Sequence, residues 1–160
     1  MIFVTTGSMV PFDRLIQIMD GWAADHPAEA VFAQIGTGRY EPRAMEFSRI
    51  LSPQDFAERV ASCSLVVAHA GMGSVISAAQ AAKPIVLFPR RQSLREHNTD
   101  HQLDTVKWLA DRPGIYVATD EVQIREQIAR ARRESVSAAP LSATAPASFA
   151  QRIRRAIIEL

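Results

Sequence analysis

The chain has 160 residues, of which 48% are hydrophobic and 22% charged, and its formal net charge is +1 at pH 7. This composition is typical of one soluble domain with its own core. The small net charge and the lack of basic runs predict no nucleic-acid partner. The single Cys63 excludes an internal disulfide and suits a reducing cytoplasm. We expect no signal peptide and no membrane-spanning segment.

Apolar runs alternate with segments of helical periodicity along most of the chain. Ser52-Pro53 marks one helix start, because serine caps a helix and proline is tolerated at its first position. The elements predicted in chain order are strand 2–6, helix 12–26, strand 31–35, strand 45–51, a helix from 53, strand 65–68, helix 75–82, strand 85–88, helix 101–110, strand 115–118 and a helix from 120 to about 133.

This alternation predicts an α/β fold of the Rossmann type, with one doubly wound parallel sheet covered on both faces by helices. We expect the domain to span residues 1–134. Residues 135–148 are rich in Ser, Ala and Pro and predict a flexible linker. Residues 149–160 predict an amphipathic C-terminal helix, which must dock on its own domain or on a partner because a helix this short is marginal alone.

The most informative motif is His69-Ala70-Gly71-Met72-Gly73-Ser74, which lies between the apolar runs 65–68 and 75–82. That order predicts a strand, a glycine turn and a helix start. Glycines allow a ligand to approach the backbone closely, and the first N–H groups of a helix are unpaired and lie at the positive end of its dipole. With the Ser74 hydroxyl and the His69 imidazole, the motif predicts a diphosphate site for a nucleotide.

Two common nucleotide-binding motifs are absent. A dinucleotide-binding domain would carry GxGxxG after the first strand, where this chain has Thr6-Gly7-Ser8-Met9-Val10-Pro11. The GxxxxGK[ST] motif of P-loop proteins does not occur. The glycine turn instead follows the fourth predicted strand, which begins the second half of the sheet.

Three segments together resemble the donor-binding half of GT-B glycosyltransferases, and within these the family 28 C-terminal domain. They are the motif 69–74, the stretch Lys83-Pro84-Ile85-Val86-Leu87-Phe88-Pro89-Arg90-Arg91, and Glu96-His97-Asn98-Thr99-Asp100-His101-Gln102. The resemblance extends over nearly the whole chain. The single-domain members of this family include the donor subunit of a dolichol-pathway GlcNAc transferase and small subunits of bacterial exopolysaccharide transferases, such as glucuronosyltransferases; the chain looks most like the bacterial group.

The resemblance implies a role for each matched position. It places Gln102, with Asp100 or His101, at the hydroxyls of the donor sugar, and it places Gly7 and Ser8 in the same cleft. The positions implied to hold the donor diphosphate are His69, Gly71, Gly73 and Ser74.

Many GT-B enzymes have a glutamate that contacts the ribose three residues after the serine, where this chain has Ser77. We hypothesise that Glu96 reaches the ribose or the sugar instead. Arg90 and Arg91 suit a sugar carboxylate, a phosphate or an acidic partner, although a solvated pair explains them at least equally well. Simpler interpretations also stand for Glu96 as a loop residue and for His101 as a helix cap.

The implied function is that of a donor-binding subunit, which moves a hexose or hexuronic acid from a UDP-sugar to a lipid-linked acceptor. The acceptor site and the general base are expected on a membrane-associated partner subunit, which would hold this chain at the cytoplasmic face of the membrane. No metal and no cofactor are expected besides the UDP-sugar substrate. Two alternatives stay open: a nucleotide-binding or regulatory module without catalysis, and a stand-alone enzyme resembling a UDP-sugar epimerase or hydrolase.

Overall fold

The computed structural model describes residues 1–138, so most of the predicted linker and the predicted helix 149–160 lie outside the described residues. The strands are β1 (Ile2–Thr5), β2 (Val31–Gln34), β3 (Glu46–Ser48), β4 (Leu65–His69), β5 (Ile85–Phe88) and β6 (Ile115–Val117). The helices are α1 (Asp13–Asp25), α2 (Pro53–Ser62), α3 (Met72–Gln80), α4 (His101–Leu109), α5 (Glu121–Glu134) and the short 3-10 helix η1 (Gln92–Leu94).

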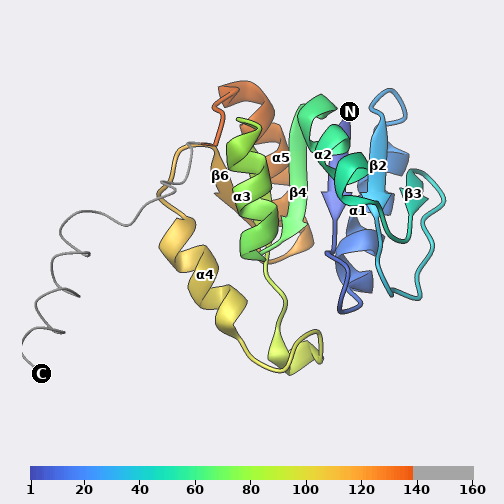
Figure 1. Ribbon diagram of the computed structural model, residues 1–160, viewed down its shortest axis with the longest axis vertical. Helices are drawn as coiled ribbons and strands as arrows, with labels where there is room; N and C mark the ends of the chain where they lie inside the picture. The colour runs from blue at the N-terminus through green and yellow to red at the C-terminus, as the bar shows by residue number, and fades with distance from the viewer. Residues whose placement is uncertain (139–160) are drawn as a thin grey trace, which may run out of the picture.

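All six strands are parallel and lie in the order β3-β2-β1-β4-β5-β6 (Figure 1). Strand β1 pairs with β2 on one side and with β4 on the other, so the direction of winding reverses between β1 and β4. This is the Rossmann order, and ligands of such sheets bind beyond the carboxyl ends of the strands at the point of reversal. The predicted fold class is confirmed.

Two apolar layers hold the helices on the sheet. Helices α1 and α5 pack on one face, and α2, α3 and α4 pack on the other. Every residue of β1, β2 and β5 is buried, which explains why these strands are continuous apolar runs in the sequence. No helix among residues 1–138 is both long and apolar enough to cross a bilayer.

Side-chain caps fix two helix starts where the sequence predicts them. The Ser52 hydroxyl accepts a hydrogen bond from the backbone N–H of Asp55 at 3.1 Å, with proline at the first position of α2. The Asp120 carboxylate accepts from the backbone N–H of Gln123 at 2.9 Å at the start of α5.

Three elements differ from the predictions by more than one or two residues. The strand predicted at 45–51 is the shorter β3, because it lies at the edge of the sheet and its last residues turn toward a cavity. Helix α3 begins at Met72 rather than at 75, because Gly71 is its N-cap and the chain turns at the glycine itself. Helix η1 is not predicted at all, since three residues carry no readable periodicity.

The structure describes residues 135–138 of the predicted linker. Helix α5 ends at Glu134, and its C-cap Ser135 has a φ of 48°. Ala138 is only 1% exposed and packs into the layer that contains α4 and β6. Ala138 therefore belongs to the apolar layer on this face of the sheet.

Candidate functional site

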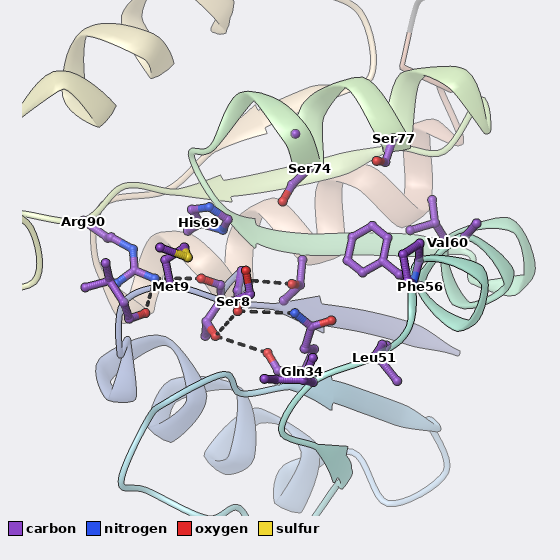
Figure 2. A pocket seen from close by; sticks show the side chains of 18 of the residues that line it. Ser8, Met9, Gln34, Leu51, Phe56, Val60, His69, Ser74, Ser77 and Arg90 are labelled. Carbon is purple, nitrogen blue, oxygen red and sulfur yellow. Dashed lines mark hydrogen bonds between the residues drawn. The ribbon is translucent and has the colours of Figure 1, made fainter.

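A cavity of about 820 Å³ opens where β1 and β4 end (Figure 2). Its floor consists of the carboxyl ends of β1, β2 and β4, while α3 covers it from one side and α2 from another. A volume of this size is typical of pockets that hold a ligand of several rings. The polar residues of the floor and the covering helix are Thr5, Thr6, Gln34, His69, Ser74, Ser77 and Gln80.

One wall of the cavity is apolar. It is built by the segment before α2 and by the first two turns of that helix, and consists of Ile50, Leu51, Pro53, Phe56, Ala57 and Val60. Phe56 and Val60 are recognisable from sequence only as the apolar side of a helix. The structure shows that this side also borders the cavity, where both side chains point inward (Figure 2).

The start of α3 has the features of an anion-binding site. Within residues 1–138, the backbone N–H groups of Met72 and Gly73 donate to no protein acceptor, as expected for the first turn of a helix. The side chains of Ser74 and Ser77 project from α3 toward the cavity (Figure 2). Backbone donors, a hydroxyl and the positive end of a helix dipole therefore meet at one point, as in known phosphate sites.

The glycines near the His69 ring differ in what an added Cβ atom would contact. A Cβ on Gly7 would lie 2.9 Å from Cε1 of His69, and a Cβ on Gly71 would overlap Nε2 of the same ring. A Cβ on Gly73 would meet no atom within 4 Å, and Gly73 lines the cavity. Gly7 and Gly71 therefore make room for the imidazole, whereas the space beside Gly73 is open to the cavity. The sequence-based interpretation is that both motif glycines serve ligand approach; the structure leaves open space at Gly73 but not at Gly71, and ligand approach at Gly73 stays a prediction.

His69 is neutral at physiological pH. Burial in first place, and then the positive charge of Arg90, lower the pKa of His69 from 6.5 to about 4. Its Nδ1 atom is buried and has no hydrogen-bond partner among the described residues. A neutral imidazole carries one donor and one acceptor nitrogen, so it can donate to a ligand oxygen without bringing a full charge.

This pKa predicts a pH dependence of stability. Because the folded-state pKa lies below the unfolded-state value, the unfolded chain binds the proton more tightly, and stability falls as the pH decreases from 6.5 toward 4. We expect protonation of His69 to lower the free energy of unfolding by on the order of 3 kcal/mol over this pH range. Urea unfolding of wild type and His69→Gln at several pH values checks it: the difference between the two curves should grow in this window. Parallel curves would contradict the assignment.

Arg90 and Gln102 both line the cavity and contact each other. The backbone N–H of Arg90 donates to Oε1 of Gln102 at 3.0 Å, and both residues are buried. This bond leaves the amide nitrogen of Gln102 for the cavity. The guanidinium of Arg90 donates to backbone carbonyls instead of standing free, so it is not available as a sugar-carboxylate ligand.

Five predicted site residues do not line the cavity; one of them, Asp100, is exposed and accepts a hydrogen bond from the backbone N–H of Gln92. Glu96 receives a two-pronged ion pair from Arg14, at 2.6 and 2.8 Å, and also accepts from the backbone N–H of Arg91. Arg91 donates to the carbonyl of Thr119. His101 is exposed, and Gly71 lies behind the His69 ring. The proposed contact of Glu96 with the ribose stays a prediction, and in this structure both of its carboxylate oxygens are already hydrogen-bonded.

The remaining predicted residues, Gly7, Ser8, His69, Gly73 and Ser74, come together at the cavity. Sequence reasoning missed Thr6, Gln34 and His97. The first two are polar residues at the ends of buried strands, and that position in a parallel sheet is the signal that would have found them. His97 lies in the segment that carried the resemblance, but no pattern separated it from its neighbours.

The strand order and the cavity at the point of reversal define a Rossmann-like domain with a cavity at its switch point, where ligands of such folds bind. Residues 1–158 match the glycosyltransferase family 28 C-terminal domain, and the chain belongs to this family. A curated relative, the UDP-N-acetylglucosamine transferase subunit ALG13 of Yarrowia lipolytica (strain CLIB 122 / E 150), is 24% identical over 136 residues. The match covers 75% of this chain and 65% of that relative.

Solved glycosyltransferases share the fold. The glycotransferase of kitacinnamycin superposes with a TM-score of 0.59 at 14% identity, covering 81% of this chain and 34% of that one. The calicheamicin glycosyltransferase CalG4 gives 0.53 at 20% identity, with coverages of 84% and 36%. SnogD from Streptomyces nogalater gives 0.51 at 18% identity, with coverages of 97% and 43%. The chain thus corresponds to less than half of each of these enzymes.

Proposed function

We propose that this chain is the donor-binding subunit of a two-component glycosyltransferase and that its donor is a UDP-sugar. Family membership supports a transferase of this class. The relative's name describes a transferase subunit, which supports a partner that completes the active site. A lipid-linked acceptor, a membrane-associated partner and a place at the cytoplasmic face of the membrane belong to the same proposal.

One observation supports the proposal most strongly. Along α3, the groups that face the cavity change in the same order as the diphosphate, ribose and base of a nucleotide. Free N–H groups and Ser74 lie at its start, where a diphosphate fits. Ser77 and Gln80 follow one and two turns later and offer hydrogen bonds to a ribose. The apolar wall with Leu51 and Phe56 then offers a flat surface for a base.

The same arrangement supplies one part of the transfer chemistry. As an acceptor hydroxyl attacks the anomeric carbon, the bond from that carbon to the diphosphate oxygen breaks, and negative charge grows on the leaving diphosphate. In this proposal the N–H groups of α3, the Ser74 hydroxyl and neutral His69 donate to that charge, which their position at the cavity supports. We assign the general base and the acceptor site to the partner, and the proposal includes no metal.

The structure weakens the reason to expect a hexuronic acid. Arg90 and Arg91 suggested a sugar carboxylate, yet both guanidinium groups donate to backbone carbonyls. The relative's name supports N-acetylglucosamine as the first sugar to test. We therefore propose an uncharged hexose or N-acetylhexosamine donor, for which Gln102 offers an amide nitrogen.

Calorimetric titration of the full chain with UDP, UDP-N-acetylglucosamine, UDP-glucose and UDP-glucuronate tests the proposal. We expect saturable binding, and Ser74→Ala should weaken UDP about tenfold, because a hydrogen bond to a charged group contributes roughly 1.5–3 kcal/mol. Ser62→Ala is the matched control, since that hydroxyl is exposed and bonds only to its own helix, at the carbonyls of Glu58 and Arg59. Equal weakening by both variants, or no binding of any nucleotide, would refute the assignment.

A transfer assay separates the two-component enzyme from its alternatives. Sugar transfer to a lipid-linked acceptor should require co-expression with the partner subunit. Turnover of the UDP-sugar by the isolated chain would instead favour a stand-alone enzyme. Nucleotide binding without transfer, even with the partner present, would favour a regulatory module.

A further inference from the structure

Arg90 has an unusual set of contacts for an arginine beside a ligand cavity. It is only 2% exposed, and its guanidinium donates to four backbone carbonyls. Three of them belong to the loop between β1 and α1, namely Thr6 at 2.7 Å, Val10 at 2.7 Å and Pro11 at 2.6 Å, and the fourth is Glu96 at 3.3 Å. One side chain therefore ties together the loops that follow β1 and β5.

The first of these loops depends on this arginine. Residues 7–10 line the cavity, and the backbone N–H groups of Ser8, Met9 and Val10 make no hydrogen bond within residues 1–138. Met9 is 85% exposed. Upstream, Gly7 is held by Thr5 and Gln34. The carbonyls that Arg90 gathers are thus the main attachment of the second half of the loop.

The second loop is held from the other side. Arg14 on α1 pairs with both carboxylate oxygens of Glu96, and the Arg14 guanidinium lies 4.2 Å from the centre of the Phe88 ring. Arg90 lies 4.6 Å from the centre of the Phe12 ring, and the two phenylalanines stack on each other. The two aromatic rings hold the guanidinium groups of Arg14 and Arg90 in place, so neither group is free to turn into the cavity.

Arg14, Arg90 and Glu96 form a cluster of charged side chains whose charges do not cancel. Arg14 and Arg90 are positive and Glu96 is negative, and the carboxylate is bound to Arg14 rather than to Arg90. Burial lowers the pKa of Arg90 to about 10, with the charge of Glu96 acting in the opposite direction, so Arg90 stays protonated at pH 7. Among the described residues that line the cavity, Arg90 is the one with a permanent charge.

We propose that Arg90 is a positioning residue with an electrostatic role: it holds the loop of residues 7–10 against the cavity and leaves one net positive charge beside the diphosphate site, without touching the donor. This inference rests on the proposed function, because it assumes that an anion occupies the start of α3. A buried charge surrounded by little water acts over a longer range than an exposed one. The charge of Arg90 should therefore strengthen the binding of UDP relative to that of uridine, which lacks the diphosphate.

The test compares the affinities of UDP and uridine for full-chain variants at fixed ionic strength. Arg90→Gln should lower the preference for UDP over uridine about tenfold, whereas Arg90→Lys, which keeps the charge, should retain most of it. Arg130→Gln removes a charge from α5 on the opposite face of the sheet and should leave the preference unchanged. A purely structural role would weaken UDP and uridine equally, and the preference would stay constant.

Glu96→Gln provides a second arm that does not remove the arginine. It raises the net charge of the cluster by one, so the preference for UDP should rise about threefold. If circular dichroism shows that Arg90→Gln does not fold, the Glu96→Gln measurement alone tests the electrostatic role of Arg90. A preference that falls or stays unchanged in Glu96→Gln overturns the inference while the proposed function stands. Failure of wild type to bind UDP overturns both.

Discussion

Replacing Gly73 with alanine is expected to weaken UDP binding at least about tenfold while leaving the fold intact. The added methyl group meets no protein atom within 4 Å and projects from the first turn of α3, where the diphosphate is proposed to bind. The backbone φ of Gly73 is not positive, so alanine adopts it without strain. Titration calorimetry gives the affinity, and thermal unfolding gives the stability.

Gly21→Ala is the matched control for this variant. Gly21 lies in the middle of α1 on the other face of the sheet, and a Cβ there would meet only the Arg125 guanidinium, at an ordinary 3.9 Å. Both substitutions should leave stability unchanged or raise it by up to about 1 kcal/mol, because alanine favours helix. Only Gly73→Ala should lose nucleotide affinity. Unaltered UDP binding in that variant would place the diphosphate elsewhere.

Gly71→Ala should have the opposite profile and destabilise the domain by about 1–3 kcal/mol, the usual cost of forcing an extra group into a packed site. The new Cβ would overlap Nε2 of His69, whose ring is confined on its other side by Gly7. Nucleotide affinity should fall as well, because the displaced imidazole would occupy cavity space. Urea unfolding measures the change in the free energy of unfolding.

A double-mutant cycle identifies the cause. In a His69→Ala background the ring is gone, so Gly71→Ala should then cost little. Equal costs in both backgrounds would show that the glycine is needed for the turn itself and not for the imidazole. Helix α3 starts directly after this residue, so circular dichroism should accompany the measurement.

The site was predictable where local patterns carry the chemistry. The order of strand, glycine turn and helix in 69–74 is enough to place free N–H groups and a serine at a strand end. The motif does not reveal that Gly71 makes room for the imidazole whereas Gly73 borders the cavity. That distinction depends on where the His69 ring turns, and the ring is positioned by Gly7, more than 60 residues earlier in the chain.

The other site assignments depended on contacts between distant segments. Glu96 looked free in a polar loop, but Arg14 lies 82 residues away in sequence and binds both of its oxygens in the folded chain. Arg90 suited either a ligand contact or a solvated surface position, but the loop after β1 surrounds it with carbonyls. Charge and residue type alone cannot distinguish a ligand-binding arginine from one that binds backbone.

By itself, the sequence determined the α/β class, the approximate strands and helices and the glycine turn after the fourth strand, because all of these follow from short-range periodicity, capping and glycine placement. Only the tertiary structure decided which side chains share the cavity. Parallel pairing of β1 with β4 brings the Gly7 loop next to His69, and packing of α2 on the same face adds the apolar wall with Phe56. Such long-range pairings depend on how the whole sheet is ordered, and no local pattern encodes that order.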